Sequence, residues 1–483
     1  MSSNTPILQC TDFPSIRITP SSSSSHPLDS PQFSIPPSIL RHLETASKHL
    51  HNHQTVALPT ETVYGLAASS LDPVALKSIY RIKNRPSDNP LIIHVSSLDM
   101  LRTVIPKDYQ ISKLYMALMT SFWPGPLSLL FPDINPPPPP APQTNAIRMP
   151  SHPLALALIH HSNLPLSAPS ANSSGRPSPT QAQHVYNDLN GSEGLGCILD
   201  GGDCGVGVES TVINGLGWRK GGGGCVDVLR PGGLGVERIK EVVERVDGGE
   251  GLTKILLHGK PWQPSNLQEK EGHAGPSGLN GEERTMVNGN STQSVKPISL
   301  PPSTPGMKYR HYSPRVPVYL LKPNTIFPRP QNLPEDAESS AQAVLRQIAR
   351  RSTSGGKGKK RIGILHFEDS NLISQISSSV VEIEDIQLIP VSLGVNASSA
   401  AQRLFAGMLT LERIPPDVED GKIGVDAIII EGCSDEGLGL AVMERVTKAV
   451  GGGGVVGDVK DDEGGKKGGG EGNTFWVDVT GNT

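Results

Sequence analysis

Residues 72–95 read DPVALKSIYRIKNRPSDNPLIIHV, and this stretch joins a predicted helix directly to a predicted strand. Asp72 can cap a helix N-terminus and Pro73 suits the first helical turn, so the helix is expected to start there. Apolar residues at helical spacing give it one buried face, and it ends near Lys83. The apolar run LIIHV (91–95) predicts a buried strand. A helix that leads into a buried strand favours an α/β fold.

The same mixture of elements extends over residues 36–246, which we interpret as a first domain. We expect strands at TVALP (55–59), PLSLLF (126–131), AIRM (146–149), LPLSA (164–168), CILD (197–200) and STVI (210–213), and helices at 38–50, 151–161 and 236–246. In the helix at 38–50, Ser38 is the expected cap and Leu40, Leu43, Ala46 and Leu50 the expected buried face. The glycine-rich run GLGWRKGGGGC (215–225) is the expected turn of a hairpin.

A second ordered region is predicted at residues 316–450. Apolar strand-like runs there alternate with helical patterns, which predicts a smaller Rossmann-like domain with a parallel sheet covered by helices. Residues 247–315 are expected to form a long linker, because much of that range is polar and rich in Gly, Ser, Asn and Pro. Residues 1–35 are expected to form a disordered leader and 451–483 a low-complexity tail.

Bulk properties exclude several protein classes. The net charge of −4 gives no overall basic field for nucleic acid. Five cysteines without a C-x-x-C pair suggest neither a disulfide framework nor a structural zinc site, and they fit a reducing, cytoplasmic compartment. The Ser- and Pro-rich, acid-poor N-terminus is also compatible with a mitochondrial form. No apolar run approaches the ~18 residues of a membrane span, so no membrane association is expected.

The cations Lys83 and Arg85 allow two interpretations. Basic residues at the C-terminus of a helix compensate its dipole, which needs no ligand. Alternatively the pair forms an anion clamp, because Arg offers a planar fork and Lys a point charge for phosphate or carboxylate. Asn89 and His94 are close enough in sequence to join such a site.

Three further stretches also allow a structural and a functional interpretation. SAPSANSSGRPSPT (167–180) is either an ordinary loop or a backbone-lined anion site, although it does not match the P-loop pattern. GVGVESTVI (205–213) is either a turn before a strand or a site where Glu209 assists a metal ion. GLGLA (437–441) lacks the third glycine of a dinucleotide fingerprint, so a structural helix start is favoured. No Ser-His-acid or Cys-His arrangement can be assembled, which argues against covalent catalysis.

Seven stretches follow one another in a fixed order: LPTETVYGLAA, KNRPSDNPLIIHV, FWPGPLSLL, AIRMPSHP, APSANSSGRPSPT, DGGDCGVGVESTVI and VLRPG. Over roughly residues 38–240 this order resembles the YrdC-like family, specifically the threonylcarbamoyl-AMP synthases. PGMKYRHYSP (305–314) and the region ending in EGCSDEGLGLAVMERVTKA resemble the linker and C-terminal domain of two-domain members. The resemblance implies a twisted open mixed sheet with helices, to which the extra domain is added.

The resemblance also implies an activity. Family members make threonylcarbamoyl-adenylate and pyrophosphate from L-threonine, bicarbonate or CO2, and ATP with Mg2+. The product serves t6A modification at position 37 of ANN-decoding tRNAs, through a separate threonylcarbamoyl-transfer complex. Binding of tRNA or double-stranded RNA is a further implied property, and an RNA-binding module without catalysis is the alternative. A hydrogenase-maturation carbamoyltransferase would predict an acylphosphatase-like region and C-x-x-C motifs, which this sequence lacks.

Individual site residues are carried over from the matching motifs. The K-x-R and S-x-N elements imply that catalysis depends on Lys83, Arg85, Ser170 and Asn172. ATP contacts are implied for Arg85, Asn89, Thr144, Ser170, Ser178, Arg230, Tyr309 and His311, the last two forming a lid with Tyr312. Threonine contacts are implied for Thr62, His94, Arg148, Ala168 and Ser210, with the threonine carboxylate on Arg148. The proline tract at 136–140, the glycine-rich turn and the polar linker exceed the family pattern, and all fall in predicted loops.

Overall fold

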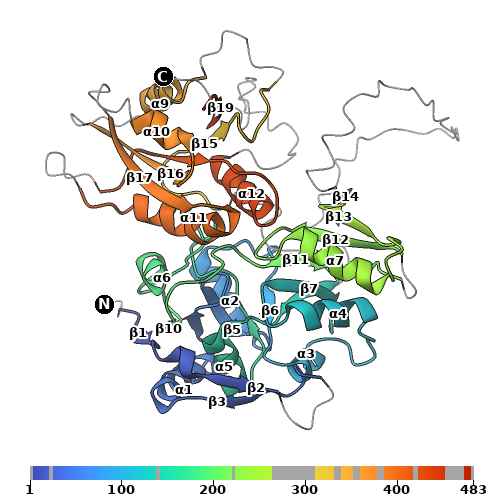
Figure 1. Ribbon diagram of the computed structural model, residues 1–483. Helices are drawn as coiled ribbons and strands as arrows, with labels where there is room; N and C mark the ends of the chain where they lie inside the picture. The colour runs from blue at the N-terminus through green and yellow to red at the C-terminus, as the bar shows by residue number, and fades with distance from the viewer. Residues whose placement is uncertain are drawn as a thin grey trace, which may run out of the picture.

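The computed structural model organises the chain around two sheets (Figure 1). The structure describes residues 4–20, 26–136, 142–219, 223–263, 311–330, 339–351, 359–377, 386–416, 423–451 and 473–479. Within these ranges no helix has both the length and the apolarity needed to cross a membrane.

The first sheet has 12 strands in the order β1-β10-β4-β5-β9-β6-β8-β7-β11-β12-β13-β14. In chain order they are β1 Ile7–Gln9, β4 Thr55–Leu58, β5 Gly65–Ser69, β6 Ile92–His94, β7 Leu127–Pro132, β8 Thr144–Arg148, β9 Leu166–Ser167, β10 Leu195–Asp200, β11 Thr211–Asn214, β12 Cys225–Arg230, β13 Lys254–Leu257 and β14 Lys260–Pro261. Pairs such as β4/β10 and β6/β8 are parallel, whereas β4/β5 and β11/β12 are antiparallel. The predicted mixed α/β sheet and the hairpin across the glycine-rich run are therefore confirmed.

Helices cover this sheet. They are α1 Pro37–His51, α2 Pro73–Lys83, α3 Leu98–Thr103, α4 Lys113–Phe122, α5 Pro153–Ser162, α6 Ala182–Leu189 and α7 Val236–Val246, with a short antiparallel ribbon of β2 Arg17–Thr19 and β3 Gln32–Ser34 beside α5. The Asp72 side chain accepts hydrogen bonds from the first backbone amides of α2, as predicted. In α1 two expectations were wrong: Ser38 is not the cap, since the helix begins at Pro37, and Ile39 is buried where Leu40 was expected.

The predicted limits of the disordered segments need three corrections. Part of the expected leader forms β1, which pairs with Ile198–Asp200 of β10. Two strands of the expected linker, β13 and β14, extend the first sheet beyond β12. Strand β19, Thr474–Val477, lies inside the expected tail and pairs with β15. These strands are very short and depend on a partner strand for their hydrogen bonds, so the polar composition around them concealed them.

The second sheet has five strands in the order β17-β16-β18-β15-β19, and all of its pairs are parallel. Its elements are β15 Val318–Pro323, β16 Lys360–Phe367, β17 Ile386–Gly394, β18 Ala427–Glu431 and β19, with α9 Ala341–Arg351, α10 Asn371–Ser377, α11 Ala397–Leu411 and α12 Gly439–Val450. The predicted parallel, helix-covered C-terminal domain is confirmed, and GLGLA is the start of α12.

Helices α11 and α12 form the face that meets the first domain (Figure 1). Val63 and Val208 of the first domain belong to the same buried apolar cluster as Phe405 of α11. Gly207 touches α11 so closely that a Cβ atom there would lie 2.4 Å from the Cα of Gln402. Its φ of 80° is also in the region that favours glycine. Gly207 in the GVGVE stretch therefore allows this close contact between the domains.

Candidate active site

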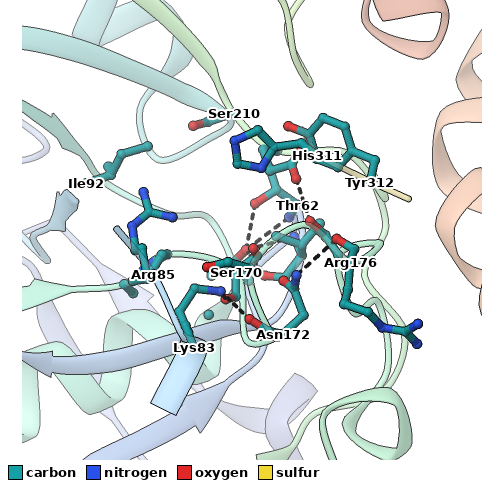
Figure 2. A pocket seen from close by; sticks show the side chains of 18 of the residues that line it. Thr62, Lys83, Arg85, Ile92, Ser170, Asn172, Arg176, Ser210, His311 and Tyr312 are labelled. Carbon is teal, nitrogen blue, oxygen red and sulfur yellow. Dashed lines mark hydrogen bonds between the residues drawn. The ribbon is translucent and has the colours of Figure 1, made fainter. Parts of the chain in front are cut away.

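One cavity, open on one side, gathers most of the predicted site residues (Figure 2). Its wall comes from the ends of α2, β6 and β8, from the loop that contains residues 168–178, from the approach to β11, from the end of β12, and from His311 and Tyr312. These segments lie far apart in the sequence. The topology of the first sheet brings them together.

The lining of this cavity is strongly basic. Lys83, Arg85, Arg148, Arg176 and Arg230 line it, and the sole carboxylate among the described lining residues belongs to Glu209. In the part of the chain that the structure describes, neither Lys83 nor Arg85 forms an ion pair with a carboxylate. A polyanion that entered the cavity would therefore meet cations that are not already neutralised by a carboxylate of the protein.

Lys83, the last residue of α2, is only 1% exposed. Its Nζ donates hydrogen bonds to the carbonyl oxygens of Ser170 and Asn172, and its own carbonyl accepts one from Ser174 N at 2.7 Å. Burial, reinforced by the charge of Arg85, holds the pKa of Lys83 well below its usual value. Lys83 therefore contacts the loop of residues 170–174 directly, as Figure 2 shows, and fixes its backbone.

Arg85 is held in place by hydrogen bonds to the loop that follows it in the sequence. Its Nη2 donates to Asn89 Oδ1 at 2.8 Å and to the Pro90 carbonyl at 2.7 Å, and its Nε donates to the Asn89 carbonyl at 3.1 Å. Burial lowers the pKa of Arg85 to about 10. Asn89 itself is buried and does not line the cavity. It acts on the site through Arg85, in contrast to the direct phosphate contact expected from the sequence.

Arg148 occupies the end of the cavity next to β6. Its Nη1 donates to Thr62 Oγ1 at 3.0 Å, and its Nη2 pairs with Glu61, whose other oxygen accepts from Ser151 N at 3.0 Å. The Nε of Arg148 is buried and has no hydrogen-bond partner. The guanidinium is thus fixed in place with one N–H still able to bind a ligand.

His94 and Arg230 complete the wall. Burial, and next the charge of Arg148, lower the pKa of His94 to about 3, so its ring is neutral at physiological pH. Arg230 donates to the carbonyl of Ser210 at 2.8 Å, and Ser210 Oγ bonds to Ser128 Oγ at 2.8 Å. The Ser178 hydroxyl donates to Glu209 at 2.5 Å. The hydroxyls of Ser210 and Ser178 therefore bond to another serine and to a carboxylate.

Buried polar atoms without hydrogen-bond partners cluster at this cavity. Among the described residues six such side-chain atoms occur, and five of them belong to lining residues: Arg148 Nε, Asn172 Oδ1, Ser174 Oγ, Arg176 Nε and His311 Nε2. An unsatisfied buried polar atom costs about 1–3 kcal/mol. Their concentration at one place is typical of a binding site, where a polar ligand supplies the missing partners.

Comparison with known proteins identifies the family. Residues 48–232 match the family described as "Telomere recombination", which covers the Sua5, YciO and YrdC proteins, and residues 279–451 match "Threonylcarbamoyl-AMP synthase, C-terminal domain". The threonylcarbamoyl-AMP synthase of Schizosaccharomyces pombe is 40% identical, over 89% of this chain and 93% of its own. That of Bacillus subtilis is 34% identical, over 84% of this chain and 92% of its own. The chain belongs to the threonylcarbamoyl-AMP synthase family.

Solved structures agree with this family. The crystal structure of Pyrococcus abyssi Sua5 complexed with L-threonine is 32% identical, has a TM-score of 0.57, and covers 84% of this chain and 94% of its own. A double variant of the same P. abyssi protein is 28% identical with a TM-score of 0.59, and covers 98% of both chains. The two-domain architecture is therefore shared with members of the threonylcarbamoyl-AMP synthase family over nearly the whole chain.

The structure places most of the site residues predicted from the family resemblance at the cavity. The following predicted residues line it: Thr62, Lys83, Arg85, His94, Arg148, Ala168, Ser170, Asn172, Ser178, Ser210, Arg230 and His311. Thr144 does not, because it lies at the opposite end of β8 from Arg148. Tyr309 lies outside the described residues. The sequence interpretation missed Thr60, Val63, Ile92 and Arg176, of which Arg176 was recognisable as the cation within SSGRPS.

The segment at 311–313 lies between the cavity and the C-terminal domain. Ser313 N donates to the Gly175 carbonyl at 2.8 Å, and Tyr312 stacks on Phe405 of α11 with ring centroids 5.2 Å apart. Tyr312 has a φ of 65°, an unusual backbone conformation for a bulky residue. His311 and Tyr312 therefore form part of the cavity wall, and their action as a lid stays a prediction (Figure 2).

The expected metal role of Glu209 is not supported by its contacts. One oxygen accepts from Ser178 and the other is paired with Arg445 of α12 at 3.0 Å. In the described ranges no group of three or more His, Cys, Asp or Glu side chains is arranged to hold a metal ion. The protein donors at this cavity are cations and hydroxyls, which suit anions better than a metal ion.

Proposed function

We propose that this protein is an L-threonylcarbamoyladenylate synthase, which forms threonylcarbamoyl-AMP and pyrophosphate from L-threonine, bicarbonate or CO2, and ATP. The observation that carries the proposal is the cavity, in a chain that matches named synthases over most of its length. Five basic side chains line it, and two of them, Arg148 and Arg176, are ion-paired with carboxylates outside the lining, Glu61 and Glu412. The one carboxylate among the described lining residues, Glu209, is paired with Arg445. A cationic cavity suits a triphosphate, and a protein of the same fold has been crystallised with L-threonine.

We assign the threonine end of the cavity to Arg148 and Thr62. The free Nε of Arg148 can donate to the threonine carboxylate, and burial makes such a charge-assisted hydrogen bond stronger than in water. The ring of His94 beside Arg148 is neutral, so it adds no positive charge that would repel the amino group of threonine. Val63, Ile92 and Ala168 provide the apolar lining available to the threonine methyl group.

We assign the phosphate end to Arg85 and Arg230, with the loop of residues 170–174 held by Lys83. In the proposed reaction the threonine nitrogen bonds to the carbon of CO2 and loses a proton. A carbamate oxygen then bonds to the α-phosphorus, and the bond from that phosphorus to the bridging oxygen breaks. Pyrophosphate leaves with the electron pair, so negative charge grows at the phosphate end. Fixed cations stabilise this charge, and no protein nucleophile is required.

We propose that Mg2+ enters with ATP as part of the substrate. The sole described carboxylate of the cavity, Glu209, is already paired with Arg445, so the protein offers no free anionic ligand of its own there. A metal ion that is coordinated mainly by phosphate oxygens and water needs no such protein cage.

The test is pyrophosphate release from Mg–ATP by the purified full chain. We expect release that requires both threonine and bicarbonate, together with a threonine- and AMP-containing product detected by mass spectrometry. Pyrophosphate release that does not require threonine, or no release at all, would overturn the proposal. Omission of each substrate in turn is the control.

The wider role proposed for the product is t6A modification at position 37 of ANN-decoding tRNAs, after transfer by a separate complex, in the cytoplasm and in a mitochondrial form. Loss of t6A from total tRNA in cells that lack the protein would test this. Direct binding of tRNA or double-stranded RNA is tested by a gel-shift assay at physiological salt, because electrostatic binding depends on salt. A fluorescent fusion of the whole chain tests the compartment.

A further inference from the structure

Glu209 places a negative charge in the wall of a cavity that is otherwise basic. It is 9% exposed and lies directly before Ser210 in the sequence. Burial alone would raise its pKa, but the charges of Arg445 and Arg230 outweigh burial and lower the pKa to about 2. The side chain is therefore ionised at physiological pH. An uncompensated carboxylate at this place would repel a phosphate ligand and attract Arg230.

The counter-charge comes from the other domain. Arg445 lies in α12 of the C-terminal domain and is 1% exposed. Its Nε and Nη2 both donate to the same oxygen of Glu209 at 3.0 Å, and its Nη1 donates to the carbonyl of Pro231, next to Arg230. Its guanidinium also lies 5.6 Å from the ring centre of Tyr312, a residue of the cavity wall. This buried cation thus contacts two residues that line the cavity, Glu209 and Tyr312, and the carbonyl next to a third, Arg230.

We propose that Arg445 is a positioning residue of the nucleotide site: it neutralises the charge of Glu209, which would otherwise repel the phosphates of ATP. The C-terminal domain is then an electrostatic part of the site in the first domain. This inference rests on the proposed function, because it takes the phosphates of ATP as the ligand of the cavity. It assigns a task to a domain whose sequence shows no catalytic motif.

A merely structural ion pair would behave differently. If Arg445 only held the domains together, its loss would reduce stability without a preference for one substrate. If it neutralises Glu209, its loss harms ATP binding specifically, and removal of the Glu209 charge repairs the harm. Glutamine at position 209 keeps the shape of the side chain, and its oxygen can still accept the hydrogen bond from Ser178.

The experiment compares Arg445→Met with the double variant Arg445→Met/Glu209→Gln in the full chain. We expect Arg445→Met to raise the KM for ATP and the calorimetric Kd for Mg–ATP by about tenfold, which corresponds to ~1.4 kcal/mol, with little change in the KM for threonine. The double variant should regain most of the ATP affinity. Arg403→Met is the matched control, because Arg403 pairs with Glu368 on the exposed surface of the same domain, 46% and 45% exposed.

Two results would overturn the inference. The first is an unchanged Kd for Mg–ATP in a folded Arg445→Met. The second is an equal loss of ATP affinity in the single and double variants, which would assign Arg445 to packing. If Arg445→Met fails to fold, the double variant still decides: normal ATP affinity in it supports charge neutralisation, and weakened affinity opposes it. If the wild-type protein binds Mg–ATP but releases no threonine-dependent pyrophosphate, the proposed function is wrong. The Kd values for Mg–ATP would still test the role of Arg445 in that case.

Discussion

Replacement of Lys83 by methionine tests whether this residue acts mainly on the loop of residues 170–174. Methionine fills a similar volume but cannot donate to the carbonyls of Ser170 and Asn172. Two hydrogen bonds from a charged donor contribute about 1.5–3 kcal/mol each, and relief of the buried ammonium offsets part of their loss. We therefore expect the free energy of unfolding to fall by about 2–3 kcal/mol, less than the ~5–15 kcal/mol that a domain has available.

Turnover should fall much further than stability. Displacement of a positioning loop by about 1 Å can cost ~100-fold in rate, so we expect a loss of that order in threonine-dependent pyrophosphate release. Urea unfolding and circular dichroism measure stability on the same samples. Lys77→Met is the control, because Lys77 lies in the same helix and is exposed. A folded Lys83→Met with near-normal turnover would refute the reasoning and leave Lys83 as a simple helix-end cation.

Two further predictions concern the same cavity. Asn89→Ala removes the side-chain oxygen that accepts a hydrogen bond from Arg85 Nη2 at 2.8 Å. We expect the KM for ATP to rise about fivefold to tenfold and the free energy of unfolding to fall by about 1 kcal/mol. An unchanged KM would mean that the Pro90 carbonyl suffices to hold Arg85. His94 has a folded-state pKa of about 3 against an ordinary value of 6.5, so the unfolded state binds its proton first as the pH falls below about 6.5. Below that pH, this group should lower the free energy of unfolding by up to about 1.4 kcal/mol per pH unit. In urea titrations at pH 5 and 7, His94→Gln should therefore show a smaller loss of unfolding free energy between the two pH values than the unsubstituted protein. An equal loss in both proteins would contradict the low pKa of His94.

Motif residues in short loops were predictable, because the residue types and their order carry the information. Lys83 and Arg85 lie two residues apart at a helix end, and the structure brings both to the cavity. Their orientations were not predictable. Lys83 contacts backbone carbonyls, and Asn89 supports Arg85 from outside the cavity. Contacts of this kind depend on how two loops pack against each other, and the local sequence pattern contains no information about that packing.

Contacts across the domain boundary were beyond sequence reasoning for a different reason. Arg445 lies in the ordinary helical pattern AVMERVTKAV, where an arginine is expected on the solvent side. It becomes buried only because α12 docks on a segment 236 residues away in the chain. The pair of Arg176 with Glu412, the residue that directly follows α11, is equally distant in sequence. Very short strands such as β1 were missed because three residues give too little periodicity to predict.

The close contact between Gly207 and α11 also bears on whether the first domain can be studied alone. A fragment ending near residue 263 would expose Val63 and Val208 to water and would leave Glu209 without Arg445. It would also lack His311 and Tyr312. Weak activity of such a fragment would then reflect an incomplete cavity wall and an uncompensated charge. Under the proposed function, the catalytic site of this chain therefore depends on residues from both sides of the boundary between the two folds.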